Sequence, residues 1–401
     1  MPASITRIAA ALLAGLTLTA CTDSQGSPGS PGSEGSPGNA AASLGCELPG
    51  GGPLALAVGA HANAPEPAIR SEVVDLMRRT AKAGHDISVI RLDGAPEVVF
   101  DTEFASDAGN DVALEDDVNA YLTEVERTLG TGARAKAPEV DVLTALSLAA
   151  DATGPGGSVV LVDPGLQTVA PLDFREVIDA EPAQVVAYLR DKKLLPDLTG
   201  RTVLLSGLGY TATPQPEPHP GLRRNIVAIW REIARAGGAA CVAVDARPNH
   251  HKAATDTPAV TVVVPPAVPT TFTACGEAEL SEGNHVGFEQ GTATFREPAE
   301  ARKTLANLAA TIGKDRLKVR LTGSTSAEGG KADNLRLSRE RAEAVKRELV
   351  ALGVPDADIT TEGRGEQLRG RADDLAPDGT LLPGPAARNR KVVVRLACPA
   401  T

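Results

Sequence analysis

Residues 334–345 read NLRLSRERAEAV, and residues 323–330, just before them, read GSTSAEGG. Four residues with small or apolar side chains follow one another at spacings of four, three and four positions: Ser338, Ala342, Val345 and Leu349. This spacing places them on one face of an α-helix, and a face of this kind packs against a sheet. Arg341 lies at the rim of that face. We therefore expect a helix here, preceded by a loop.

The neighbouring residues predict a small α+β domain around this helix. A strand-like run over residues 286–295 leads to a helical pattern over 299–312 and then to an apolar run at 317–321. The segment closes with NRKVVV at residues 389–394, which is typical of a final strand. We place this domain at residues 285–398.

These motifs resemble the OmpA-like peptidoglycan-associated domain, whose pattern reads G-x-T-D-x-x-G, then N-x-x-L-S-x-x-R-A-x-x-V, then N-R-[RK]-V. The resemblance implies a site for peptidoglycan. The family's arginine at the position of Arg341 holds the carboxylate of the diamino acid in a peptidoglycan stem peptide. A guanidinium suits this role because it stays charged and pairs with a carboxylate through two hydrogen bonds.

The resemblance also implies roles for residues near Arg341. It implies that the loop and the first helical turn around the ligand are shaped by Thr325, Asn334, Leu337 and Ser338. Arg390, at the start of the last strand, has two interpretations that stay open. It is either a second basic contact to the ligand or an ordinary charge at a strand end.

One residue departs from the family pattern. Ser326 stands 15 residues before Arg341, where the family has the aspartate that accepts a hydrogen bond from the ammonium group of the diamino acid. A hydroxyl still accepts such a bond, but it loses the charge-assisted share, on the order of 1–2 kcal/mol. Glu328, two residues further on, is the candidate for the missing carboxylate. We expect weak peptidoglycan binding unless Glu328 compensates.

Residues 46–270 predict an α/β domain with a doubly wound, mostly parallel sheet. Short runs rich in Val, Leu and Ala suit strands buried on both faces, and their alternation with helical patterns favours parallel pairing. The runs cover residues 54–60, 86–92, 158–162, 202–206, 239–244 and 260–264, and the helical patterns cover 68–83, 114–129, 140–151, 183–192 and 222–236. A break rich in Pro and Thr follows, and we assign residues 271–284 to a linker.

Ligands of such sheets bind beyond the carboxyl ends of the strands. The order of elements resembles a von Willebrand factor A-type domain, in which a D-x-S-x-S motif after the first strand holds a divalent cation. Residues 60–64 read AHANA, which lacks the carboxylate and both hydroxyls, and Asp163 alone does not make a Mg²⁺ site. The resemblance therefore implies a metal-free scaffold or partner-binding surface.

The first 20 residues have the pattern of an export signal. Arg7 precedes an apolar run over residues 8–18 that is too short to span a bilayer, and the run ends in LTAC at residues 18–21. These four residues resemble the lipobox of bacterial lipoproteins, which implies that Cys21 is lipidated and becomes the mature N-terminus. Residues 21–45, rich in Gly, Ser and Pro, are expected to form a solvated tether.

The remaining cysteines predict two disulfide bonds. With Cys21 lipidated, Cys46, Cys241, Cys275 and Cys398 are left, and an exported chain favours their pairing. Four cysteines allow three connectivities. We favour Cys46–Cys241 and Cys275–Cys398, because each pair brackets one predicted domain.

The composition of the chain argues against two classes of function. The net charge of −11 argues against sequence-independent nucleic-acid binding, and aromatic residues, at 2%, are too scarce for a stacking platform. We expect a lipoprotein of the cell envelope that faces the cell wall and links membrane to peptidoglycan, with no catalytic residue, metal or cofactor. The α/β domain would contact an unknown envelope protein.

Two alternatives stay open. In one, the α/β domain is a binding module for a protein or small-molecule partner, and wall attachment only localises it. In the other, the protein is a wall-associated hydrolase that uses His61 or Asp163. The sequence has no G-x-S-x-G motif around Ser206 to support a serine nucleophile.

Overall fold

The computed structural model describes residues 46, 48–49, 51–266 and 271–398. The predicted signal at residues 1–20, the lipidation site Cys21 and the tether at residues 21–45 lie outside these residues. Within the described part of the chain, each helix is too short or too polar to cross a bilayer.

The first domain is built on a six-stranded sheet with the strand order β3-β2-β1-β4-β5-β6. Neighbouring strands are parallel except at the edge, where β3 runs antiparallel to β2, so the predicted mostly parallel sheet is confirmed. The strands are β1 (Leu54–Val58), β2 (Ile87–Arg91), β3 (Glu97–Thr102), β4 (Ser158–Val162), β5 (Thr202–Ser206) and β6 (Cys241–Asp245).

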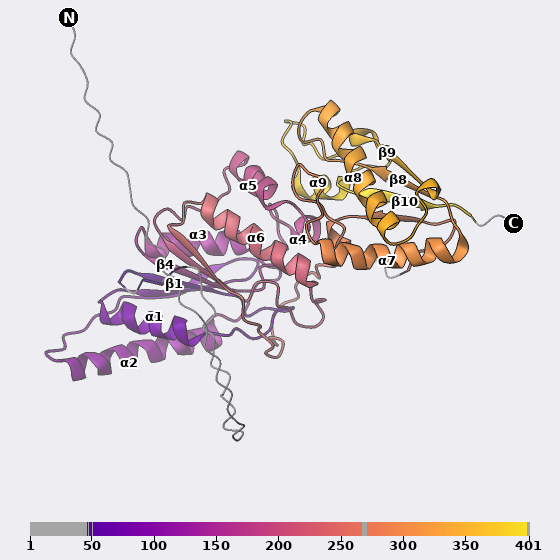
Figure 1. Ribbon diagram of the computed structural model, residues 1–401. Coiled ribbons are helices and arrows are strands. Elements are labelled where there is room, and N and C mark those ends of the chain that lie inside the picture. Colours follow the sequence, from indigo (N-terminus) through magenta and orange to yellow (C-terminus); the bar gives the residue numbers. More distant parts are fainter. Residues whose placement is uncertain (1–45, 47, 50, 267–270, 399–401) are drawn as a thin grey trace, which may run out of the picture. The chain divides into compact units, whose positions relative to one another are not determined.

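Helices cover both faces of this sheet, and β1 explains why both are apolar. Its alternate residues Leu54, Leu56 and Val58 pack toward α1 and α2, whereas Ala55 and Ala57 belong to the core beneath α3, α5 and α6. The helices α1 and α2 lie side by side (Figure 1). The helices are α1 (Ser71–Lys82), α2 (Asp111–Arg127), α3 (Val142–Thr153), α4 (Phe174–Val177), α5 (Pro182–Asp191) and α6 (Pro220–Ala236), and a π-helical turn, η1 (Thr128–Gly132), extends α2.

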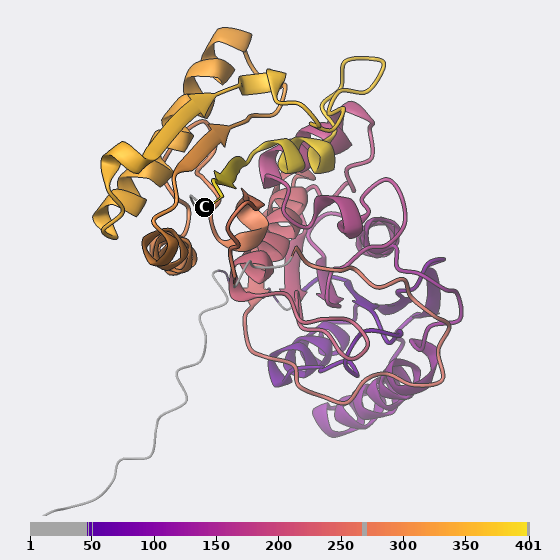
Figure 2. The ribbon, with the colours of Figure 1, turned by 90° about the vertical axis from the view of Figure 1, so that its right-hand side faces the viewer.

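The second domain is a smaller α+β unit, drawn in orange and yellow in Figure 2. Its four strands have the order β7-β10-β8-β9; β8 and β9 are parallel and the other pairs antiparallel. The strands are β7 (Glu277–Leu280), β8 (Val319–Gly323), β9 (Ile359–Gly363) and β10 (Val392–Leu396). The helices are α7 (Pro298–Asp315), α8 (Lys331–Ala351) and α9 (Pro383–Asn389), with short 3-10 turns η2 (Glu282–Asn284), η3 (Asp356–Asp358) and η4 (Gly365–Gln367).

The helix predicted from residues 334–345 is α8, and it packs on the sheet as expected. Its four face residues, Ser338, Ala342, Val345 and Leu349, are fully buried. Two glycines allow the close approach: a Cβ at Gly323 would lie 1.9 Å from the Ser338 carbonyl oxygen, and one at Gly363 would lie 2.6 Å from the Arg339 nitrogen. Any larger residue at either position would push α8 away from the strands.

Strands β3 and β9 were not predicted, and three assigned segments differ from the sequence prediction. Residues 260–264 form a loop instead of a strand; Val263 is buried there, and its backbone exchanges two hydrogen bonds with the side-chain amide of Gln215. Residues 286–295 form a loop with one isolated bridge between Phe288 and Phe295. Residues 277–280, assigned to the linker, form β7, which pairs with β10.

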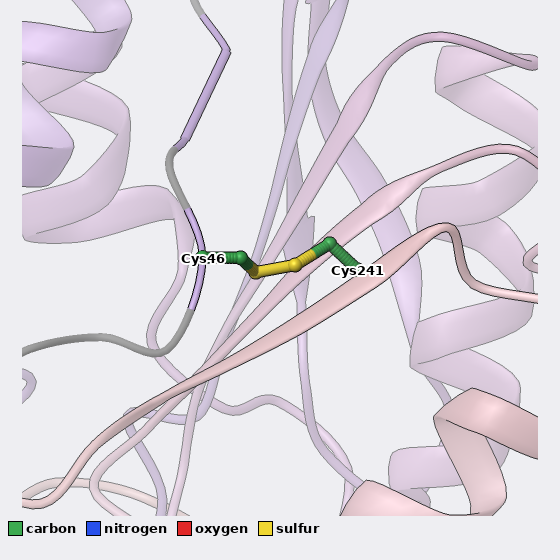
Figure 3. Close-up of a disulfide and its surroundings, with 2 residues drawn as sticks. All are labelled: Cys46 and Cys241. Atoms are coloured by element: carbon green, nitrogen blue, oxygen red, sulfur yellow. A yellow bond between two sulfur atoms is a disulfide. The ribbon is translucent and has the colours of Figure 1, made fainter. Parts of the chain in front are cut away.

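Both predicted disulfide bonds are present. Cys46 is bonded to Cys241 on the edge strand β6, with 6.4 Å between their Cα atoms (Figure 3). Cys275 is bonded to Cys398, with 4.4 Å between their Cα atoms. Each bond therefore joins the start of one domain to a late or final segment of the same domain.

Candidate functional site

A cavity of about 320 Å³ lies beside the first turns of α8. Seven of the eight residues predicted for the site line it: Thr325, Ser326, Glu328, Asn334, Leu337, Arg341 and Arg390. They come from the loop after β8, from α8 and from the C-terminal end of α9, just before β10, which the fold brings to one place. The volume falls at the small end of the range for ligand pockets.

Ser338 is the exception, and it supports the cavity from behind. Its hydroxyl accepts a hydrogen bond from the Gly365 nitrogen at 2.9 Å and donates one to the Leu335 carbonyl at 2.8 Å. Gly365 in turn accepts from the backbone nitrogen of Thr325 at 3.1 Å. Ser338 thus holds η4, which holds the loop that carries Thr325 and Ser326.

Arg341 is the buried cation of the cavity. Only 3% of its surface is exposed, its Nε donates to the Thr292 carbonyl at 2.9 Å, and its guanidinium lies over the Phe288 ring at 5.2 Å from the centroid. Burial lowers the pKa of Arg341 to about 10, and the positive charge of Arg390 acts in the same direction. Arg341 stays charged at neutral pH, and no carboxylate among the described residues forms an ion pair with it.

The loop opposite Arg341 offers oxygen atoms to a ligand. Thr325 is 2% exposed, and its hydroxyl has no hydrogen-bond partner among the described residues. Ser326 is also buried, while Glu328 is exposed to solvent and its carboxylate accepts from the side-chain amide of Gln184. The loop therefore presents two hydroxyls and one carboxylate to the cavity.

Two asparagines, Asn334 in the cavity wall and Asn389 next to Arg390, fix the surrounding backbone. Asn334 donates from Nδ2 to Glu366 at 2.8 Å, which fixes the first turn of α8 against η4. Asn389 is fully buried, and its side chain exchanges two 2.9 Å hydrogen bonds with the backbone of Ala372. The first contact fixes the start of α8, and the second fixes the backbone next to Arg390.

The sequence did not predict that α5 of the first domain also lines this cavity. Gln184 accepts from Nη1 of Arg390 at 2.6 Å, and Glu181 pairs with Arg296. Gln290 and Gly291 complete the lining. Arg390 and Gln184 are 206 residues apart in the chain, so no local pattern could have linked them.

The carboxyl ends of β1 and β4 in the first domain are closed. His61 bonds Asp163 between Nε2 and Oδ2 at 2.8 Å, both side chains are buried, and Asp163 also accepts from the Gly165 nitrogen at 2.6 Å. Burial alone would lower the pKa of His61, but the charge and hydrogen bond of Asp163 outweigh it and raise the pKa. The cavity beside Asp163 holds only about 10 Å³.

A segment of the chain covers these strand ends. The backbone of Ala254 donates to Ala64 at 3.0 Å, and Asn63 donates from its side chain to the Val260 carbonyl at 3.0 Å. In the part of the chain that the structure describes, no group of three or more His, Cys, Asp or Glu side chains is placed to hold a metal ion.

The mixed four-stranded sheet under α7 and α8, with an arginine-lined cavity beside α8, defines a small α+β domain with a cationic site. Residues 287–378 match the OmpA family, so the chain contains an OmpA family domain in its C-terminal part. The likeness of the first domain to a von Willebrand factor A-type domain stays a prediction.

Several known proteins are similar to this part of the chain. The probable lipoprotein YiaD of Escherichia coli (strain K12) is 33% identical over 119 residues, and the match covers 29% of this chain and 50% of that protein. The chain thus matches about half the length of this curated relative.

Solved structures are similar too. The peptidoglycan-associated lipoprotein from Burkholderia pseudomallei is 24% identical, covering 27% of this chain and 86% of that chain, with a TM-score of 0.23. The cell wall anchor of the T6SS from Pseudomonas aeruginosa is 24% identical, covering 28% and 75%, with a TM-score of 0.23.

Proposed function

We propose that this protein is an exported, membrane-anchored lipoprotein that binds peptidoglycan non-covalently through its OmpA family domain and so links the membrane to the cell wall. The family match and the similarity to a probable lipoprotein support this proposal. The observation that carries it is Arg341, a buried cation that lines a cavity and lacks a carboxylate partner among the described residues.

The cavity suits a ligand that carries both charges. A carboxylate of the diamino acid would pair with the guanidinium of Arg341, and burial strengthens such a pair because little water competes for it. The unpartnered hydroxyl of Thr325 would donate to the same carboxylate or to a neighbouring carbonyl of the stem peptide.

Glu328 is the proposed acceptor for the ammonium group. Its carboxylate already accepts a hydrogen bond from an N–H donor, the amide of Gln184, at the edge of the cavity. An ammonium group at the same place would gain a full charge interaction, which Ser326 alone cannot supply. Glu328 therefore takes over the role that the family aspartate has at the position of Ser326.

The first domain is proposed to present a surface to another envelope protein. The carboxyl ends of β1 and β4, where doubly wound sheets bind small ligands, are filled by the His61–Asp163 pair and by the covering segment. At the ends of β1 and β4, a protein surface is therefore a better candidate than a small-molecule pocket.

Calorimetric titration with a synthetic stem peptide tests the wall-binding site. The mature chain should bind a peptide that ends in meso-diaminopimelate and should bind the lysine version, which lacks the second carboxylate, much more weakly. Arg341→Ala should abolish the difference, whereas Arg339→Ala, on the exposed side of the same helix, should keep it. Equal binding by Arg341→Ala and the wild type would remove the site assignment.

Membrane fractionation tests the anchor. Cys21→Ala should release the protein from the membrane fraction. Unchanged retention of this variant would refute anchoring through Cys21.

A further inference from the structure

We propose that α5 of the first domain carries a built-in occupant of the wall-binding cavity, the side-chain amide of Gln184, which peptidoglycan must displace. The structure described above is then the closed state of the protein. This inference rests on the proposed function, because it assigns a regulation to that same site.

Gln184 lies between the two charged groups on opposite sides of the cavity. Its carbonyl oxygen accepts from Nη1 of Arg390 at 2.6 Å, and its amide nitrogen donates to the carboxylate of Glu328. Only 4% of Gln184 is exposed. Arg390 and Glu328 both belong to the OmpA family domain, so this one side chain bridges the cavity from the other domain.

The polarity of these two bonds is that of an amino acid head group. Gln184 places an acceptor oxygen on a guanidinium and an N–H donor on a carboxylate, as a diamino acid would place its carboxylate and its ammonium group. Each bond has only one charged partner, whereas the ligand would make both bonds between charges. Charge-assisted bonds with two ions are the stronger kind, so the ligand has an advantage over Gln184.

Gln184 occupies only part of the cavity, so the ligand can bind first to the part that Gln184 leaves open. Among the described residues, the Gln184 side chain makes no hydrogen bond to Arg341 or to the unpartnered hydroxyl of Thr325. A carboxylate can therefore reach Arg341 while the cavity is still closed. Its ammonium group can then replace the amide of Gln184 at Glu328.

Several ion pairs join the two domains around this point, beside the packing of α9 against α4 and α5. Acidic residues of the first domain meet arginines of the second in the pairs Glu181–Arg296 and Glu176–Arg388, and Lys192 pairs with Asp378 at 2.6 Å. Burial raises the pKa of Asp179 in the same acidic group, which the positive charge of Arg390 only partly offsets. Ionic contacts between domains are weakened by salt and are compatible with separation.

The test is calorimetric titration of the full mature chain with the meso-diaminopimelate stem peptide. Gln184→Ala should bind about ten times more tightly than the wild type, as expected if the open form is about one tenth of the molecules. Arg190→Ala, an exposed substitution on the same helix, should bind like the wild type. The thermal midpoint of each variant is measured alongside, to confirm that it is folded.

Hydrogen exchange on the wild-type chain gives a second measurement that needs no variant. The peptide should speed the exchange of amides in residues 181–186 while it slows exchange in the loop at 325–330. A ligand that bound without displacing α5 would leave exchange in 181–186 unchanged, and this result would overturn the inference.

The possible failures are distinguishable. If Arg341→Ala loses binding but Gln184→Ala binds like the wild type, the inference is wrong and the wall-binding site stands. If neither the wild type nor Gln184→Ala binds the peptide at all, the proposed function fails and the inference falls with it.

Discussion

Both domains bury charged side chains, but they differ in whether such a side chain has an oppositely charged partner in the chain. At the strand ends of the first domain, His61 and Asp163 are buried together and neutralise each other at 2.8 Å. In the OmpA family domain, Arg341 is equally buried but pairs with a backbone carbonyl and an aromatic ring instead of an acid. A buried charge with its partner in the same chain stabilises the fold, whereas one without a partner is available to a ligand.

The same contrast holds for the other acids at the strand ends. Asp93, after β2, accepts from the backbone nitrogens of Lys136 and Ala137 at 2.8 and 3.0 Å. Asp245, at the end of β6, accepts from the side chain of Arg247 at 2.7 Å. These carboxylates hold loops against the sheet, and their hydrogen-bond partners lie in the chain itself.

The largest effect that we predict is on stability and comes from breaking the pair of His61 and Asp163. His61→Ala leaves the carboxylate of Asp163 buried without its partner, which should lower the free energy of unfolding by about 3–5 kcal/mol. Urea unfolding measures this, with His250→Ala, an exposed position, as the control. Peptidoglycan binding by the folded variant should be unchanged, and a loss of binding would mean that the two regions are not independent.

The His61 pair also has a predicted pH dependence. The pKa of His61 is higher in the folded than in the unfolded protein, because Asp163 favours the protonated ring. The stabilisation by this pair is therefore complete below pH about 6.5 and is lost as the pH rises through the folded pKa. The stability difference between wild type and His61→Ala should shrink accordingly in alkaline buffer.

The next effect, on binding, comes from removing the unpaired charge. Arg341→Met keeps much of the apolar stem and removes the guanidinium, so it should weaken binding of the stem peptide by about 10- to 100-fold, as expected for a charged hydrogen bond. Its free energy of unfolding should change by less than about 1 kcal/mol, because no carboxylate loses a partner. A strongly destabilised variant would show that Arg341 has a structural role like that of His61.

A smaller gain is expected from restoring the family residue. Ser326→Asp supplies the carboxylate that the family pattern has at this position and should tighten peptide binding by a factor of about 5 to 20. Calorimetric titration measures it, and Glu328→Gln in the same background shows whether the two carboxylates are redundant. No gain in Ser326→Asp would indicate that Glu328 already serves the ammonium group fully.

The smallest effect concerns a second histidine with the opposite behaviour. Burial, with the nearby charge of His285, lowers the pKa of His219 to about 4. Its neutral ring caps α6 by accepting from the Leu222 nitrogen at 3.3 Å, and its Nε2 lies 3.2 Å from the Gly283 carbonyl. This stabilisation is complete above pH about 6.5 and is lost as the pH falls toward 4.

Thermal unfolding between pH 7.5 and 5 measures the contribution of His219. His219→Asn keeps a side chain that caps helices but does not titrate, so its midpoint should fall less on acidification than that of the wild type. Parallel curves for the two proteins would contradict the assignment.

Burial explains which parts of the fold could be predicted. The strands β4 and β5 were predicted to the residue because all their side chains are buried, which makes an uninterrupted apolar run. The edge strand β3 was missed because most of its side chains are exposed or half-buried, and β7, with the sequence EAEL, was missed for the same reason. Residues 260–264 were wrongly predicted as a strand, because an apolar loop that covers strand ends has the composition of a strand.

The candidate site also has a part that could be predicted from the sequence and a part that could not. Arg341, Ser326 and their neighbours are recognisable because they follow one another at fixed spacings along a loop and a helix. Glu181 and Gln184 could not be predicted from sequence spacing because they belong to another domain. Their contacts with Arg296 and Arg390 depend on tertiary structure alone. Ser338 was predicted to shape the loop and helical turn around the ligand, and its hydroxyl bonds the η4 turn at the point where α8 packs closely on Gly323.

The Cys46–Cys241 bond determines which strands would carry mechanical load in an anchored protein. In the proposed anchored state, a pull between the membrane and a domain held by the wall would enter the described chain at Cys46 and cross the disulfide bond directly to Cys241. The chain between these cysteines, including β1 to β5, lies inside the covalent loop and bears no tension. The edge strand β6 takes the force instead, so cell-envelope stress would leave the centre of the sheet folded for as long as the bridge stays oxidised.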